Sequence, residues 1–286
     1  MKPLVFAITG ANGQIGAFLV QQLRGMGHVV YECVRSPDKA STGLYYRFFE
    51  LSKLDAMPDL HHIDVLIHAA HFFDTTHEHY ESINCIGTER LFMKACEEDV
   101  KYTIFISTIS AYVGARSLYG RVKYQLEQTF LREKLRGAIV RPGLVIHEPL
   151  RGIAATMNRF VKRYPIVPLI GRGQQLIYPC ALSELSQLIL HLATHQPIIQ
   201  RPIVASARQG MTFKKFVKHL AKRQQKMRLL LPVSFHMIYF MLKLLEKIGL
   251  SIGLRSDSLL GLQYANQQLD FSETNGLGIN FSALES

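Results

Sequence analysis

The sequence predicts an α/β protein built on a doubly wound parallel sheet. Strand-like and helix-like runs alternate through the first half of the 286-residue chain, as βαβ units require. Most strand-like runs are continuously apolar, which is typical of strands covered by helices on both faces. The runs that define this pattern are residues 4–9, 15–26, 28–34, 64–69, 83–98, 103–107, 119–132 and 138–141.

The alternation weakens after Pro142. Prolines and glycines interrupt the next segment, and helical patterns return near 183–193 and 212–223. No internal repeat or low-complexity linker marks a boundary between independent domains. We therefore expect one domain over residues 1–286, with a smaller, mainly helical, substrate-facing C-terminal lobe drawn mainly from 143–180 and 205–286.

Composition indicates a globular protein of a reducing compartment. Apolar residues make up 48% of the chain, enough for a sizeable core. The four cysteines have no CxxC spacing, so neither a disulfide framework nor a zinc ribbon is indicated. The first apolar run reaches Gly10 too early for a secretory signal. We read this run as a strand and expect a cytoplasmic protein.

The formal net charge is +11, from 33 basic and 22 acidic residues. A surplus of this size favours anionic partners, such as phosphorylated cofactors, nucleic acid or acidic lipid headgroups. The basic residues are spread along the chain and are not gathered in an arm with interleaved aromatic residues. We therefore expect no nucleic-acid partner.

A glycine-rich turn, Thr9-Gly-Ala-Asn-Gly-Gln-Ile-Gly16, joins the first strand to an amphipathic helix. This context is that of a dinucleotide-binding fingerprint, because glycines permit the tight turn and let the backbone approach a pyrophosphate. Free N–H groups at the start of the helix bind negative charge. A tight turn without a ligand is the alternative. The predicted cofactor-binding residues of this Rossmann-type turn are Gly10, Asn12, Gly13, Gln14, Ile15 and Gly16.

The end of the second strand bears on which dinucleotide the predicted turn would bind. Val34 is followed by Arg35, and not by the carboxylate that usually holds the adenosine ribose of NAD. Arg35 could instead meet a 2′-phosphate, so NADP is preferred and NAD stays open. The alternative is a solvated arginine at a strand end. The role of Glu32 on the same strand is left open.

Tyr119 and Lys123 are four residues apart, which places both on one face of a predicted helix. Carbonyl reduction or alcohol oxidation needs a proton donor or acceptor, and a phenol with a pKa of about 10 must be lowered by a cation to act near neutrality. Lys123 would supply that cation. Thr108 follows the fifth strand and could hydrogen-bond the reacting oxygen, with Ser110 as the fallback. The alternative is an ordinary surface helix.

Together with the glycine turn, these residues resemble the short-chain dehydrogenase/reductase superfamily. The resemblance spans roughly residues 1–190 and is strongest to the extended branch of nucleotide-sugar epimerases and dehydratases and their atypical relatives. Three further segments also match that branch: Asp64-Val-Leu-Ile-His68-Ala69-Ala70, Asn84-x-x-Gly87-Thr88 and Arg141-Pro142-Gly143.

The resemblance implies a role for each matching residue. Thr108 orients the substrate, Tyr119 acts as acid and base, and Lys123 binds the cofactor ribose and lowers the pKa of the phenol. The implied activity is that of an NAD(P)-dependent oxidoreductase, epimerase or dehydratase, with hydride transfer at a carbonyl or alcohol carbon of a small molecule such as a nucleotide sugar. The implied cofactor-lining residues are His68, Ala69, Ala70, Pro142 and Gly143.

Two departures from the branch bear on the substrate. Only ten residues separate Thr108 from Tyr119, where sugar-nucleotide enzymes usually carry a longer loop, and residues 178–184 lack the branch's His-x-Asp element. Short-loop members resemble an atypical group of reductases, cofactor-sensing regulators and a respiratory complex I accessory subunit. A non-catalytic NAD(P)-binding sensor or assembly protein is therefore the alternative function.

Two other segments leave alternatives open. The histidines between 61 and 79 show no recurring ligand spacing, so we expect no metal site and favour substrate contact by His71 or Tyr80. The apolar segment 229–242 is too short to span a bilayer. The helical stripe within 232–249 suits core or homodimer packing, or docking at a membrane surface, where it would serve a lipid-linked substrate.

Overall fold

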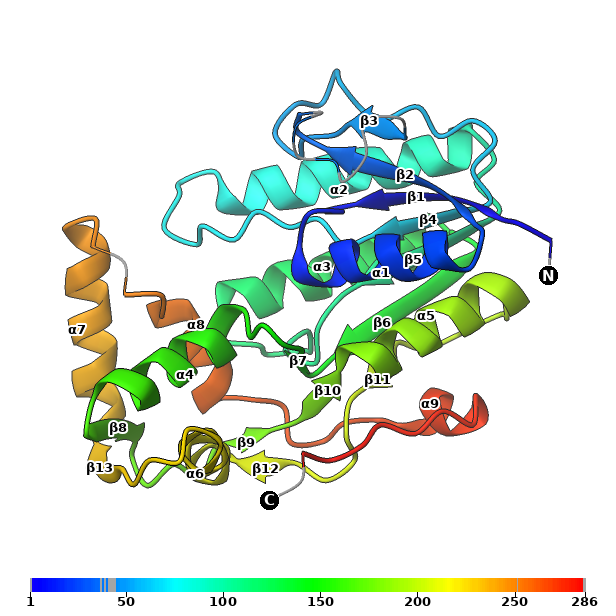
Figure 1. The fold of residues 1–286 in the computed structure, drawn as a ribbon. Helices are drawn as coiled ribbons and strands as arrows, with labels where there is room; N and C mark the ends of the chain where they lie inside the picture. The colour runs from blue at the N-terminus through cyan, green and yellow to red at the C-terminus, as the bar shows by residue number, and fades with distance from the viewer. Residues whose placement is uncertain (1, 37, 39, 41–44, 251, 285–286) are drawn as a thin grey trace.

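The computed structural model describes residues 2–36, 38, 40, 45–250 and 252–284 (Figure 1). Its largest sheet consists of seven strands: β1 (Val5–Thr9), β2 (Val29–Val34), β3 (Tyr46–Phe48), β4 (Val65–His68), β5 (Tyr102–Ile106), β6 (Gly137–Pro142) and β11 (Ile203–Ala205). They lie in the order β11-β6-β5-β4-β1-β2-β3, and every pairing is parallel. The chain order reverses between β1 and β4, so the predicted doubly wound sheet is confirmed.

Two pairs of helices cover the two faces of this sheet (Figure 1). They are α1 (Gln14–Gly25) and α5 (Leu182–His195) on one face, and α2 (Tyr80–Glu97) and α3 (Leu118–Arg132) on the other. Ile104 and Ile106 of β5 pack in the α1–α5 layer, whereas Phe105 between them packs in the α2–α3 layer. Because both faces are covered, all five residues of β5 are buried, which explains the apolar run.

The C-terminal lobe has an apolar cluster of its own, to which Met157, Phe216, Leu242 and Leu259 contribute. Its elements are α4 (Gly152–Arg163), β8 (Ile166–Ile170), β9 (Leu176–Ile177), β12 (Met211–Thr212), α6 (Phe213–Arg223), β13 (Leu229–Val233), α7 (Phe235–Lys247) and α8 (Ser256–Gln263). Strand β13 pairs with β8 and β12 with β9. The helical patterns predicted near 183–193 and 212–223 correspond to α5 and α6.

Three further elements connect the lobe to the sheet. They are β7 (Leu144–Ile146), β10 (Pro179–Ala181) and α9 (Ser272–Gly276). Strands β7 and β10 pair in parallel, and α9 lies against β11, the edge strand of the large sheet. The two short strands therefore lead the chain from the sheet into the lobe and back.

The apolar segment 229–242 divides into a strand and a helix. Pro232 and Val233 end β13, and α7 starts two residues after Val233, at Phe235. Among the described residues, no helix is long and apolar enough to cross a membrane.

The glycine turn brings α1 unusually close to the sheet. Gly10 has a φ of +67°, and a Cβ built on it would lie 2.8 Å from the Ala70 nitrogen. A Cβ on Gly16 would lie 2.2 Å from the Gly10 carbonyl oxygen, closer than real Cβ contacts come. The amide of Gly13 donates to the same oxygen at 2.9 Å. The turn can therefore keep this shape only if positions 10 and 16 are glycine.

Two glycine-to-alanine substitutions on α1 test this constraint. Gly16→Ala should lower the free energy of unfolding by about 1–3 kcal/mol, because its methyl group meets backbone that must shift. Gly25→Ala is the matched control: it lies on the same helix, its Cβ would meet nothing within 4 Å, and it should stabilise by about 0.5–1 kcal/mol. Urea unfolding measures both. Equal effects at the two positions would contradict the close packing of Gly16.

Candidate functional site

Four loops meet at the carboxyl edge of the central strands. They follow β1, β4, β5 and β6, which are neighbouring parallel strands and therefore end at the same edge. Open parallel sheets bind ligands at this edge, near the point where the strand order reverses. The segments that the loops place there are residues 10–16, 69–70, 107–110 and 142–143.

The start of α1 is suited to binding an anion. Gly13 caps the helix without a side chain, and the first turn contains no acidic residue. The side-chain nitrogen of Gln14 is buried at this point and has no hydrogen-bond partner among the described residues. Free amides, the helix dipole and an unpaired amide donor all favour a phosphate here. These residues fit the pyrophosphate of a dinucleotide; Asn12 is exposed beside them and Ile15 is half-buried.

The three predicted cofactor-lining residues at the end of β4, His68, Ala69 and Ala70, differ in their access to a ligand. His68 is fully buried; its Nδ1 lies 2.7 Å from the Thr9 hydroxyl and its Nε2 lies 3.0 Å from the Thr88 hydroxyl. Burial also lowers its pKa well below the usual value, so the ring is neutral. The side chain of His68 is thus bound within the protein. Ala69 and Ala70, which are half-buried, form the surface facing the glycine turn.

Arg35 and Glu32, at the end of β2 and within it, differ in exposure. Arg35 follows β2 and is exposed, where it is accessible to a ligand at the sheet edge. Glu32 is buried within β2 and forms an ion pair with Arg24 at 2.7 Å. Its carboxylate therefore braces α1 against β2, which gives Glu32 a structural role.

Tyr119 lies in the first turn of α3, among polar and aromatic neighbours. Its ring packs edge-on against His71, with the ring centroids 5.0 Å apart, and stacks on Phe73 at 6.1 Å. Burial raises the pKa of Tyr119 to about 12, and a side-chain hydrogen bond with Thr108 acts in the opposite direction. The structure thus brings the predicted site residues Tyr119 and Thr108 together.

Lys123 lies one turn further along α3 and is almost fully buried. Its Nζ donates a hydrogen bond to the Ile106 carbonyl at 2.8 Å and lies 4.7 Å from the centre of the Phe105 ring. Burial lowers the pKa of Lys123 to about 7, although Glu127 acts to raise it. The expected lowering of the Tyr119 pKa by Lys123 is not observed: burial raises that pKa, and the Lys123 amine is directed to the Ile106 carbonyl.

Glu127 continues the same face of α3 and was not singled out in the sequence. It is fully buried and accepts a hydrogen bond from the Ser107 hydroxyl at 2.5 Å, and its two oxygens accept from Nε and Nη2 of Arg141. Burial raises the pKa of this carboxyl, and the Arg141 and Ser107 contacts oppose that rise. Its spacing of four residues from Lys123 was the available signal.

The first turn of α3 is capped from the far end of the chain. The Asp257 carboxylate accepts hydrogen bonds from the amides of Leu118, at 2.6 Å, and Tyr119, at 3.1 Å. The hydroxyl of Ser117 caps the Gly120 amide of the same turn. Asp257 thus fixes the backbone of Tyr119, and no local sequence pattern predicts a contact across 138 residues.

His71 and Tyr80 differ in their access to the site. The Nε2 atom of His71 lies 2.8 Å from the Tyr80 hydroxyl, and the half-buried His71 ring contacts Tyr119. Tyr80 is 1% exposed, so it supports His71 from behind. Ser110 is half-buried, and its amide donates to the Thr108 hydroxyl at 3.2 Å. Of these three residues, His71 is the one that adjoins the predicted acid/base.

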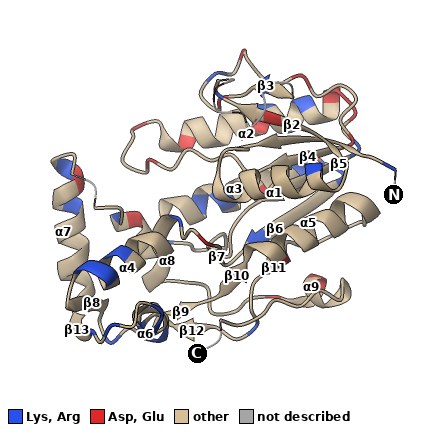
Figure 2. Cartoon of the chain, in the orientation of Figure 1, with Lys and Arg blue, Asp and Glu red and all other residues tan. Residues whose placement is uncertain are grey.

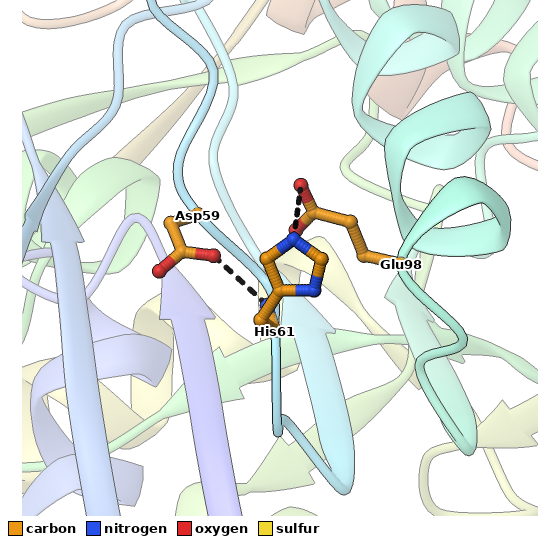
Figure 3. A group of neighbouring side chains, drawn as sticks. All are labelled: Asp59, His61 and Glu98. Carbon is orange, nitrogen blue, oxygen red and sulfur yellow. Dashed lines mark hydrogen bonds and ion pairs between the residues drawn. The ribbon is translucent and has the colours of Figure 1, made fainter.

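Three side chains of the kinds that bind metal ions lie close together at the opposite edge of the sheet. Asp59, His61 and Glu98 hold their ligand atoms within 4.8 Å of one another (Figure 3). Arg47 pairs with Asp59 and Lys94 with Glu98, so cations of the protein already balance the carboxylates. Within the described ranges this is the one such group, and of the histidines between 61 and 79 only His61 belongs to it.

Two curated sequences are similar to the chain. NADH dehydrogenase (ubiquinone) 1 alpha subcomplex subunit 9, mitochondrial, of Arabidopsis thaliana is 26% identical over 200 residues, which are 65% of this chain and 49% of that protein. UDP-glucose 4-epimerase of Vibrio cholerae is 24% identical over 262 residues, which are 81% of this chain and 79% of the epimerase. The chain thus spans about half the length of the Arabidopsis protein.

Among solved structures, dTDP-4-dehydrorhamnose reductase of Bacillus anthracis in complex with NADP superimposes with a TM-score of 0.67 at 18% identity, covering 90% of this chain and 97% of the reductase. This likeness shows a shared fold. Residues 6–145 also match the NAD dependent epimerase/dehydratase family, and all four loops of the sheet edge fall within that match. The match covers 140 of the 286 residues and includes the glycine turn and the Tyr119–Lys123 helix, so this part of the chain is similar to that family.

Proposed function

We propose that the chain is an NADP-preferring enzyme that transfers hydride at a carbonyl or alcohol carbon of a small molecule, with Tyr119 as acid and base. One observation carries the proposal: Tyr119 and Thr108 adjoin at the same sheet edge as a glycine turn with an unpaired phosphate donor, Gln14. A bound nicotinamide would supply or accept the hydride. The residues of the chain then have only the proton and the reacting oxygen to handle.

In the reduction direction, the Tyr119 hydroxyl donates its proton to the carbonyl oxygen as that oxygen gains negative charge. Thr108 donates a hydrogen bond to the same oxygen and fixes its position. The pKa of Tyr119, about 12 before cofactor binds, keeps the phenol protonated at neutral pH. The protonated phenol is the form that can donate this proton.

A nucleotide sugar is the substrate class that we favour. The Vibrio cholerae relative is named a UDP-glucose 4-epimerase, and the Bacillus anthracis structure is of a reductase named for a dTDP-sugar. Both kinds of reaction use a hydride and a proton at the same carbon–oxygen bond. The segment between Thr108 and Tyr119 has only ten residues, shorter than is usual in sugar-nucleotide enzymes. Reductase chemistry and epimerase or dehydratase chemistry therefore stay open as alternatives.

A non-catalytic role is the second candidate. The Arabidopsis relative is named a subunit of a dehydrogenase, and here the Lys123 amine is bound to a backbone carbonyl. A sensor or assembly protein would need the cofactor pocket but no proton transfer. If Tyr119→Phe left the biological role intact while Gly13→Asp abolished it, this candidate would replace the enzyme.

Cofactor preference is tested by titrating NADPH and NADH into the wild type and Arg35→Ala, followed by cofactor fluorescence. We expect Arg35→Ala to weaken NADPH binding about 10- to 100-fold, as the loss of a charged hydrogen bond to phosphate should, and to leave NADH binding nearly unchanged. Arg201→Ala is the control, because this arginine is also exposed but follows α5, beyond the carboxyl-edge loops. If Arg35→Ala weakened the binding of NADPH and NADH equally, Arg35 would not contact the 2′-phosphate.

Acid/base catalysis is tested by Tyr119→Phe with a panel of carbonyl compounds that includes keto-sugar nucleotides. The rate of NADPH oxidation should fall about 10²- to 10⁴-fold, because the proton donor is lost, while NADPH affinity is retained. Tyr124→Phe is the control: it lies five residues after Tyr119 on α3, which turns it away from the Tyr119 side of the helix, and it should keep the rate. A Tyr119→Phe protein with wild-type turnover would exclude Tyr119 as the acid.

The buried state of Lys123 has a measurable pH dependence. Its pKa is about 7 in the folded protein and about 10.4 when exposed, so folding disfavours the protonated amine. This destabilisation is complete below pH 7 and fades as the pH rises toward 10.4. Lys123→Met should therefore raise the free energy of unfolding of the cofactor-free protein more at pH 6 than at pH 9.

Thermal and urea unfolding at the two pH values check this prediction. Lys218→Met is the control, since that lysine is exposed on α6 and should show no such difference. A gain from Lys123→Met that is independent of pH would mean that folding does not lower the pKa of the Lys123 amine.

A further inference from the structure

Helix α7 exposes an apolar face that the rest of the described chain leaves uncovered. Ile238 and Leu242 turn inward and are at most 9% exposed, whereas Phe240 and Leu244 are 67% and 62% exposed. The helix is therefore apolar on both its inner and its outer side. The outer side chains recur at helical spacing: Met237, Phe240, Met241, Leu244 and Ile248.

Other apolar side chains of the lobe are exposed as well. Ile166 of β8 and its partner Leu229 of β13 are both exposed. Between these strands, α4 and α7 lies a cavity of about 200 Å³ lined almost entirely by apolar side chains, with Met237 and Met241 in its wall. A cavity of this size and lining can hold an apolar group in place of water. The outer face of α7 thus adjoins a second apolar site.

The positive charge of the chain is concentrated in the same lobe. Residues 151–176 and 208–255 contain sixteen lysines and arginines and one acidic residue, whereas the rest of the chain contains seventeen basic and twenty-one acidic residues. The basic residues, although spread along the sequence, thus gather on α4, α6 and α7 in space (Figure 2). Lys243 and Lys247 lie on α7 itself, and Lys162 and Arg163 end α4.

We propose that this surface docks the C-terminal lobe onto an anionic lipid bilayer, with α7 lying in the plane of the interface. Its outer side chains would enter the acyl region while the surrounding lysines and arginines meet lipid phosphates. A second copy of the chain is a poorer occupant, because a symmetric contact through α7 would bring two strongly basic lobes together. The proposal is independent of the proposed function, since the α7 face contains none of the site residues.

Insertion can be followed with a single fluorophore, because the chain has no tryptophan. Phe240→Trp should give a blue-shifted emission, quenched by brominated acyl chains, with vesicles of phosphatidylcholine and phosphatidylglycerol but not of phosphatidylcholine alone. Ile198→Trp is the control, at an 89% exposed apolar position outside the lobe, and its emission should not shift. An unshifted Phe240→Trp emission with the anionic vesicles at low salt would overturn the proposal.

Co-sedimentation with the same vesicles tests the contribution of α7 to binding. Leu244→Glu should reduce the bound fraction about tenfold or more, because it places a charge where an apolar group enters the bilayer. Ile198→Glu should have no effect, and both proteins should keep the wild-type melting temperature and NADPH affinity. Added salt should weaken wild-type binding. If Leu244→Glu instead converts a dimer to a monomer, or leaves vesicle binding unchanged, the face binds another partner and the proposal fails.

Discussion

The site depends on how α3 is held against β5 and β6 by buried charged groups. The Lys123 ammonium is bound to the Ile106 carbonyl, and the Glu127 carboxylate binds Ser107 and Arg141. A charge buried without a partner is costly, so these contacts allow α3 little freedom to slide or rotate. Tyr119 lies one turn before Lys123, and its position beside Thr108 follows from this anchoring.

The opposite wall of the site has a steric origin. Gly16 and Gly10 let α1 approach β1 so closely that a methyl group would not fit, and this approach directs the first amides of α1 toward the sheet edge. Because β1, β4, β5 and β6 run parallel, the glycine turn and the Tyr119 helix meet at that same edge. A dinucleotide bound between them would reach from phosphate-binding amides to a proton donor. The C-terminal lobe adds to this arrangement through Asp257, which caps the first turn of α3.

Much of this arrangement could be predicted because the signals are local in sequence. The apolar strands, the glycine turn and the Tyr119–Lys123 spacing each occupy a short window of sequence. The observed strands and helices lie close to the predicted ranges; α2, for example, starts at Tyr80, three residues before its predicted start. Strand β3 was missed because three half-buried residues carry no periodicity. The cap from Asp257 joins distant segments, and the burial of Lys123 depends on packing around Phe105, so neither leaves a trace in the sequence pattern.

The central claim is that a nicotinamide dinucleotide binds between the glycine turn and Tyr119. A crystal structure of the chain grown with NADPH tests it most directly. The expected result is a pyrophosphate against the first amides of α1, within reach of the Gln14 side chain, and a nicotinamide ring beside Tyr119 and Thr108. A folded protein that leaves this edge empty at saturating NADPH, or binds the dinucleotide elsewhere, would contradict the claim.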